Sequence, residues 1–238
     1  MLHMTAAQDT QILGLDGPVA EVVRPEGRAP ICLVCEHASA EIPAALGDLG
    51  LARADRFSHA VWDIGAEALA RALSDRLDAP LVLSRISRLV YDCNRPPERP
   101  DAMPAQTETI AIPGNRALSP EARAARAAAV YEPFHATLSA QLGRMAGRPA
   151  FVTVHSFTPV WMGTPRSTEI GLLHDADARL AQAMQAAAAP GFSVQLNQPY
   201  SAADGVTHTL ARHATARGLP NVMIEVRNDL LASPAQVA

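Results

Sequence analysis

The 238-residue sequence contains no lysine, so its 20 basic side chains are all arginines. It also lacks a basic run, and its formal net charge is −4 with a pI of about 6.0. Domains that bind nucleic acid carry clustered positive charge, and we therefore expect no nucleic-acid partner. Arginine reads carboxylates better than lysine does, which makes the arginines candidate contacts for an acidic small molecule.

Long apolar runs are also missing. No apolar run in the sequence is long enough to span a bilayer. Residues 1–10 lack the basic-then-apolar pattern of a secretory signal. We therefore expect a cytoplasmic protein with no membrane association.

Cysteine is scarce, and the count of three is odd. A disulfide scaffold is therefore not expected. Cys32 and Cys35 form a C-x-x-C, but they lie in an apolar run that is typical of a buried strand. Positions i and i+3 of a strand face opposite sides, so we predict two buried core residues and no redox pair.

Aromatic residues make up only 4% of the chain, whereas hydrophobic residues, many of them alanine, make up 48%. This composition predicts helices that pack closely on a sheet with few bulky side chains. Apolar runs and turn residues predict strands at 30–35, 80–84, 88–92, 150–154, 169–173, 192–196 and 221–226. Helical periodicity and capping residues predict helices at 61–77, 119–144, 176–188 and 210–217.

The predicted strands and helices alternate along the chain. This order favours a three-layer α/β fold, hydrolase- or phosphorylase-like, whose mostly parallel or mixed central sheet has helices on both faces. A proline-rich loop at 96–116 interrupts the pattern, and loops of this length in compact domains are usually functional or disordered. No repeat or linker divides the chain, so we expect a single domain over residues 1–238.

Three polar side chains follow or end predicted strands: His37, His155 and Glu225. Parallel sheets place ligand sites at the carboxyl ends of their strands, and two histidines with an acid there indicate a metal site. A third ligand is needed, and both Asp63 and Glu41 are candidates. Glu36 is adjacent to His37 and is expected to point elsewhere.

Glu225 has two interpretations. It could act as the base beside a metal-activated water. Alternatively, it could be a buried acid paired with Arg227 or another arginine.

The segment 84–95 places three arginines, Asp92 and Asn94 within otherwise apolar sequence. The arginines could bind a substrate carboxylate through bidentate hydrogen bonds. They could instead form an internal network with Asp92 that braces the site.

Over about residues 30–231, the sequence resembles the N-formylglutamate amidohydrolase family. The resemblance rests on eight segments in the family's order: 34–39 (VCEHAS), 62–66 (WDIGA), 87–96 (SRLVYDCNRP), 112–115 (IPGN), 154–159 (VHSFTP), 197–201 (NQPYS), 212–220 (RHATARGLP) and 224–230 (IEVRNDL).

The resemblance implies a fold like that of zinc carboxypeptidases and amidases. It implies a Zn²⁺ site formed by His37, Asp63 and His155, which favours Asp63 over Glu41, and it implies Glu225 as the catalytic acid and base. It also suggests that Arg88, Asn94 and Arg95 hold the substrate carboxylates. The implied reaction is hydrolysis of the N-acyl bond of an acidic amino acid, such as N-formyl-L-glutamate. The alternative is a zinc amidase or peptidase that acts on a peptide or cell-wall fragment.

Overall fold

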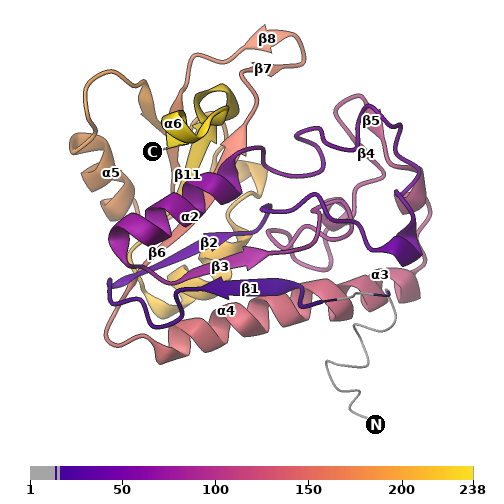
Figure 1. Cartoon of the computed structure of the whole chain (residues 1–238), viewed down its shortest axis with the longest axis horizontal. Coiled ribbons are helices and arrows are strands. Elements are labelled where there is room, and N and C mark those ends of the chain that lie inside the picture. The colour runs from indigo at the N-terminus through magenta and orange to yellow at the C-terminus, as the bar shows by residue number, and fades with distance from the viewer. Residues whose placement is uncertain (1–13, 15–16, 238) are drawn as a thin grey trace.

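A seven-stranded sheet forms the centre of the computed structural model, which describes residue 14 and residues 17–237. Its strand order is β1-β3-β2-β6-β11-β9-β10, and Figure 1 labels the first five of these strands. The strands are β1 (Ala20–Val23), β2 (Ile31–Cys35), β3 (Leu81–Ser84), β6 (Ala150–Phe157), β9 (Ile170–Leu173), β10 (Val194–Leu196) and β11 (Asn221–Arg227).

The four central strands β3, β2, β6 and β11 run parallel to one another. β1 joins antiparallel to β3 at one edge. β9 pairs antiparallel with β11, and β10 follows β9 in parallel. The sheet is therefore mixed with a parallel centre, which confirms the predicted fold class.

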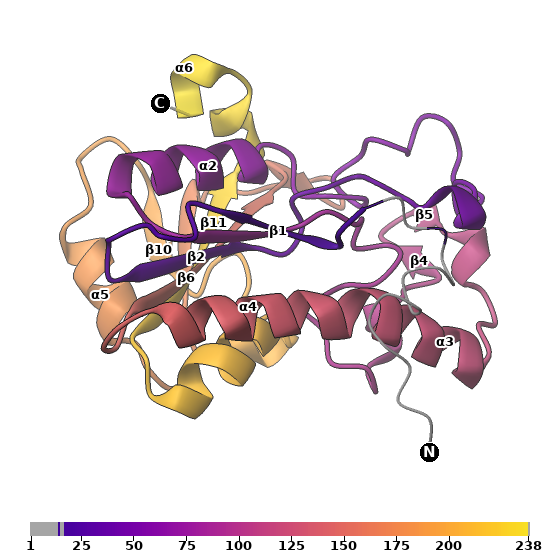
Figure 2. The ribbon, with the colours of Figure 1, turned by 60° about the horizontal axis from the view of Figure 1, so that its bottom comes forward.

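Helices cover both faces of this sheet, as Figure 2 shows for α2 and α4. On one face, α2 (Ala66–Leu77) and α5 (Arg179–Ala186) share a buried apolar cluster with the strands. On the other face, α4 (Glu132–Arg144) and the π-helical turn η6 (Leu210–Ala214) belong to a second cluster. These three layers confirm the predicted architecture.

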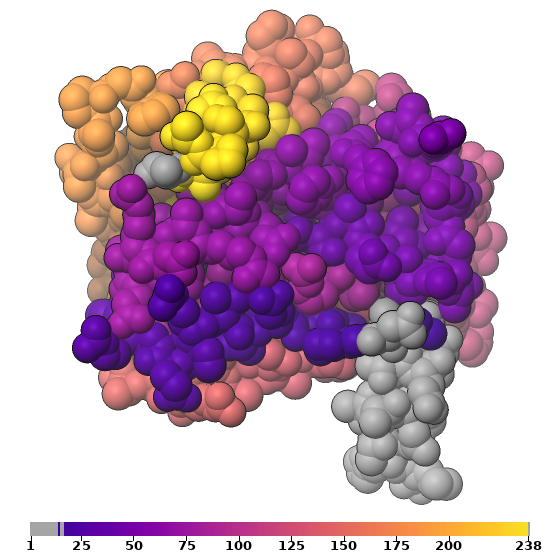
Figure 3. Space-filling view, in the orientation of Figure 1, coloured from indigo at the N-terminus to yellow at the C-terminus, as the bar shows by residue number. Residues whose placement is uncertain are grey.

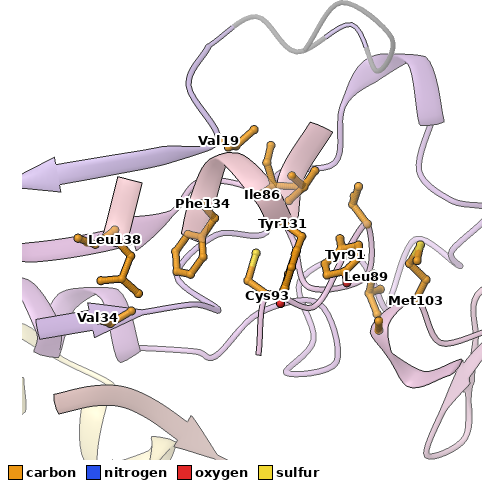
Figure 4. Packing of buried hydrophobic residues seen from close by; sticks show 14 of the residues in the cluster. Val19, Val34, Ile86, Leu89, Tyr91, Cys93, Met103, Tyr131, Phe134 and Leu138 are labelled. Carbon is orange, nitrogen blue, oxygen red and sulfur yellow. The ribbon is translucent and has the colours of Figure 1, made fainter. Parts of the chain in front are cut away.

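Small side chains let the helices approach the sheet. Ala66, Ala70 and Ala181 are fully buried on the α2 side. Four buried aromatic side chains, Tyr91, Tyr131, Phe134 and Phe151, belong to the cluster on the α4 side, and Figure 4 shows Tyr131 beside Cys93. Apolar burial of this kind is the main favourable contribution to folding.

The two cysteines of the C-x-x-C lie on opposite faces of β2, as predicted. Cys32 belongs to the cluster on the α4 side and Cys35 to the cluster on the α2 side. Both thiols are free and buried, and burial raises the pKa of Cys32 to about 12. They are therefore protonated core residues.

Two sequence predictions are wrong in detail. The helix expected at 61–77 begins at Ala66, because the backbone N–H of Asp63 bonds to the carbonyl of His37 and holds residues 61–65 outside the helix. Residues 88–92, predicted as a strand, form a turn instead. The Ser87 hydroxyl accepts a hydrogen bond from the N–H of Leu89, and this contact favours a turn. The side chains of residues 89–92 are nevertheless buried, as those of a central strand would be.

The helix predicted at 119–144 is continuous but changes pitch. It runs through α3 (Pro120–Arg126), the π-helical segment η4 (Ala127–Tyr131) and α4. Ser119 caps its start by accepting a hydrogen bond from the N–H of Ala122. Pro133 lacks an N–H and would clash with the preceding turn of a regular helix, and the wider π turn accommodates it.

The 96–116 loop contains a small hairpin of β4 (Gln106–Thr107) and β5 (Ile110–Ala111). A second hairpin, β7 (Val160–Trp161) and β8 (Thr164–Pro165), rises at the top of Figures 1 and 3. The remaining short helices are η1 (Ala44–Leu46), η2 (Pro100–Ala102), η3 (Pro113–Asn115), η5 (Ala202–Asp204), η7 (Thr215–Arg217), η8 (Asn228–Leu231) and α6 (Pro234–Val237). Among the described residues, no helix is both long and apolar enough to cross a bilayer.

Candidate active site

The central parallel strands bring the predicted site residues together. His37 follows β2, while His155 lies near the end of β6 and not beyond it. Glu225 is in β11, directly opposite His155 in the strand register. Asp63 joins them because its backbone N–H donates to the carbonyl of His37 at 3.0 Å.

Three side-chain atoms converge at the centre of this group. Oδ2 of Asp63 lies 3.2 Å from Nδ1 of His37 and 2.9 Å from Nδ1 of His155. The two Nδ1 atoms are 3.2 Å apart. All three side chains are buried.

The outer nitrogen of each histidine faces a further carboxylate. Nε2 of His37 lies 2.8 Å from Oδ1 of Asp92, and Nε2 of His155 lies 3.2 Å from Oε2 of Glu36. A neutral imidazole that carries its proton on an Nε2 facing a carboxylate presents the lone pair of its Nδ1 inward. Two nitrogen lone pairs and a carboxylate oxygen at this spacing repel one another unless a proton or a metal ion lies among them, and the neighbouring carboxylates accordingly raise the pKa of both imidazoles against the effect of burial.

These ligand atoms fit a metal ion. Atoms bound at about 2.0–2.1 Å to a tetrahedral zinc ion lie roughly 3.3 Å from one another, close to the spacing found here. Two imidazoles and a carboxylate are a usual ligand set for catalytic zinc, with one position left for water. Metal-binding histidines also typically donate their outer N–H to a carboxylate, as Asp92 and Glu36 allow.

The structure separates the two candidates for the third ligand. Asp63 is in the cluster, whereas the side chain of Glu41 is exposed and lies outside it. Glu36 points away from the three converging ligand atoms, as expected, but it still belongs to the site. The strand ends at Cys35, and beyond it Glu36 and His37 are both buried, with Glu36 facing His155.

Glu225 differs from Glu36, Asp63 and Asp92 because no basic side chain of the described residues lies within 4.0 Å of its carboxylate. Its side chain is buried, and its Oε2 atom has no hydrogen-bond partner in the part of the chain that the structure describes. Arg227 pairs with Asp229 and Glu169, so the alternative of a Glu225–Arg227 ion pair is wrong. Burial raises the pKa of Glu225 to about 7, and the nearby charge of Asp63 adds to the rise.

A cavity of about 290 Å³ opens over these groups. His37, Asp63, His155 and Glu225 lie in its wall. Its outer wall comes from loops that sequence reasoning did not assign to the site: the β4–β5 hairpin with Glu108, which pairs with His59, and the aromatic side chains Trp161 and Tyr200. In the sequence, only the unusual length of the 96–116 loop indicated that this part of the wall could be functional.

Comparison with family models gives one decisive match. Residues 29–232 match the model of the N-formylglutamate amidohydrolase family. The chain belongs to the N-formylglutamate amidohydrolase family. Comparison with curated protein sequences gives no match.

Two solved structures resemble this N-formylglutamate amidohydrolase family member. Gene product Atu2144 from Agrobacterium tumefaciens is 50% identical, with a TM-score of 0.91, over 93% of this chain and 90% of that one. The N-formylglutamate amidohydrolase from Ralstonia eutropha JMP134 is 19% identical, with a TM-score of 0.65, over 89% of this chain and 86% of that one. At that identity the second likeness shows the shared fold.

The residues that the family resemblance suggested for the substrate are in the cavity wall, but their side chains are engaged. Arg88 donates to Asp63 at 3.3 Å and to Asp92 at 2.9 Å, which is the bracing network considered from the sequence. Burial opposes the charged form of Asp92, yet His37 and Arg88 hold the pKa of this carboxyl well below its usual range.

Asn94 and Arg95 are engaged in the same way. The amide of Asn94 donates to the carbonyl of Val206 and accepts from the N–H of Thr209 at 2.9 Å. It therefore ties a neighbouring segment to the cavity wall. Nε of Arg95 donates to Asp101 at 3.1 Å. In this family member, a substrate carboxylate would have to compete with protein carboxylates for both arginines.

Proposed function

We propose that this family member is a zinc-dependent amidohydrolase that removes the N-formyl group from an acidic amino acid such as N-formyl-L-glutamate. The observation that carries the proposal is the convergence of three metal-ligand atoms beside a free, buried carboxylate. The family match supports amide hydrolysis. The ligand types and their spacing support zinc.

The residues divide the work as follows. His37, Asp63 and His155 would hold the ion, while Asp92 and Glu36 orient the two imidazoles through their outer N–H groups. Zinc in such a site supplies Lewis-acid chemistry toward a carbonyl group and toward water.

Glu225 would accept a proton from the attacking water at its free Oε2 atom and deliver it to the leaving amine. A pKa near 7 suits both halves of that role, because the carboxyl takes up and releases a proton near neutral pH. Its place opposite His155 in the strand register puts it beside the metal ligands without making it one of them.

The size of the cavity favours a small substrate. A volume of about 290 Å³ is at the lower end for ligand pockets and suits a single acylated amino acid better than a peptide or cell-wall fragment. The amidase alternative therefore becomes an outcome of the test.

The proposal is tested by metal analysis of the purified protein, followed by assays of formate release from N-formyl-L-glutamate with and without a chelator. We expect about one zinc per chain, formate release, and loss of activity on chelation that added zinc restores. No bound metal and no effect of the chelator would contradict the zinc proposal. Bound zinc without formate release would favour the amidase or peptidase alternative.

A further inference from the structure

Among the described residues, one arginine next to the cavity has no acidic partner. Both terminal nitrogens of Arg88 face Asp63 and Asp92, and Arg95 pairs with Asp101. Arg166 differs from them. No carboxylate of the described residues lies within 4.0 Å of its guanidinium, whose Nη1 and Nη2 donate to the carbonyl of Thr158 at 3.4 Å and the hydroxyl of Tyr200 at 3.0 Å.

Three aromatic rings lie around the Arg166 guanidinium. Its central carbon lies 4.9 Å from the ring centres of Trp161 and Tyr200 and 5.4 Å from that of Phe157. Cation–π contacts of this kind hold a guanidinium without neutralising its charge. Two of its five N–H groups are used, so three remain available for a ligand.

The backbone of Arg166 is held as firmly. Its N–H donates to the carbonyl of Pro159 at 2.8 Å, which closes the base of the β7–β8 hairpin. Its carbonyl accepts from Arg227 at 3.1 Å. A guanidinium fixed at both ends loses little entropy when it binds an anion.

The rings around Arg166 also belong to the active-site cavity. Phe157, Trp161 and Tyr200 line it together with His155. Phe157 is two residues beyond His155 in β6, so both side chains project from the same face of the strand. Tyr200 lies close enough to Glu225 that its carboxylate adds to the rise that burial causes in the pKa of the phenol.

We propose that Arg166 is the specificity-determining residue that binds a carboxylate of the substrate. This inference rests on the proposed function, because it assigns the substrate's negative charge to a residue that contacts four lining residues of the same cavity: Phe157, Thr158, Trp161 and Tyr200. An Arg–carboxylate pair can be bidentate, and the free N–H groups of Arg166 provide that geometry. Arg88 and Arg95 then act on the protein's own carboxylates, not on those of the substrate.

The test compares binding of L-glutamate, L-glutamine and L-isoglutamine to the zinc-loaded protein by calorimetry. The two amides each remove one carboxylate of glutamate. The variants are Arg166→Met, Arg166→Lys, and the control Arg179→Met, which removes an exposed arginine paired with Asp177. Zinc content and melting temperature are measured for each, so that a folding defect is recognised.

We expect Arg166→Met to weaken glutamate binding about 30- to 100-fold, as for loss of a charge-assisted pair. One of the two amides keeps the carboxylate that Arg166 contacts, and its binding should weaken by the same factor as that of glutamate. Binding of the other amide, which lacks that carboxylate, should not change. Arg166→Lys should fall between, because it keeps the charge but loses the planar fork. Arg179→Met should match the wild type.

Equal weakening of all three ligands, no weakening of glutamate, or no binding of glutamate by the wild type would each overturn the assignment. Formate release from the three N-formylated ligands is followed in parallel. If the wild type releases formate from none of them, the proposed function fails, while the binding measurements still decide the role of Arg166.

Discussion

At the scale of single residues, Glu225 stands apart because it is buried, free of arginine and beside the proposed metal ligands. Glu225→Gln keeps its shape but cannot accept the proton. We predict that kcat falls about 10²- to 10⁴-fold while zinc content stays unchanged, as for loss of a general base. Steady-state assays with metal analysis test this, with the exposed Glu41→Gln as the matched control. Wild-type kcat in Glu225→Gln would remove Glu225 from the mechanism.

The pKa of the same residue predicts a pH dependence. Burial raises the pKa of Glu225 to about 7, and only the deprotonated form accepts a proton. Therefore kcat/KM should rise about tenfold per pH unit below pH 7 and level off above it. A pH profile of the zinc-loaded enzyme tests this, and the residual activity of Glu225→Gln should lack that limb.

The carboxylate behind His155 gives a third prediction at this scale. Glu36→Gln removes the negative charge that faces Nε2 of His155 at 3.2 Å. We expect zinc affinity to fall about 10- to 100-fold, the usual effect of losing such a partner. Competition titration with a chromogenic chelator measures it, and Glu41→Gln should bind zinc as the wild type does. Equal affinities for both variants would show that Glu36 has no part in the site.

At the scale of elements, Gly171 in β9 decides where the segment carrying Tyr200 runs. It lies opposite Glu225 in the register, and a Cβ there would be 1.9 Å from the carbonyl oxygen of Gln198. We predict that Gly171→Ala lowers the free energy of unfolding by at least about 2 kcal/mol and reduces activity, since backbone must move.

The control for that prediction is Gly143→Ala. Gly143 is in α4, and a Cβ there meets nothing within 4 Å. Alanine should stabilise the helix by up to about 1 kcal/mol. Urea unfolding monitored by circular dichroism tests both variants, and equal stability of the two would contradict the close approach at Gly171.

Elements also show where sequence patterns were insufficient. The strands at 31–35, 150–157 and 221–227 were predicted because continuous apolar runs identify buried parallel strands. The run at 88–92 was predicted as a strand for the same reason and is a buried turn. Burial determines apolar composition in both cases, so composition alone does not distinguish them.

At the scale of the whole molecule, a buried pair of histidines on the α4 side links acidity to stability. His213 donates to Nδ1 of His135 at 2.7 Å, and His135 donates to the carbonyl of Cys93 at 3.0 Å. Burial lowers the pKa of His135 to about 2 and that of His213 to about 4. Both are therefore neutral in the folded state at pH 5, whereas the unfolded chain protonates them below about 6.5.

The unfolded state therefore binds more protons than the folded state. As a result, the free energy of unfolding decreases as the pH is lowered below about 6.5. Each histidine contributes about 1.4 kcal/mol per pH unit. The glutamine amide of His213→Gln can still donate to His135. Between pH 6.5 and 5, the free energy of unfolding of this variant should change less steeply with pH than that of the wild type, by about 1.4 kcal/mol per pH unit. Urea unfolding at a series of pH values tests this, and identical slopes would show that His213 is not neutral in the fold.

Other conclusions at this scale stay predictions: the single domain, the cytoplasmic location and the absence of a nucleic-acid partner. The search for a signal pattern concerned residues 1–10, which lie outside the described part of the chain.

The sequence by itself determined the layer architecture and the residues that meet at the strand ends. Alternating apolar strands and amphipathic helices have few other ways to bury their apolar faces, and parallel strands end at one edge. Tertiary structure alone decided that Glu36 and Asp92 face the outer nitrogens of the two histidines and that, among the described residues, Arg166 has no acidic partner. It also brought Asp63, which the family resemblance had favoured, and not Glu41 to the histidines. Those outcomes depend on contacts between residues far apart in the chain, which spacing and composition do not encode.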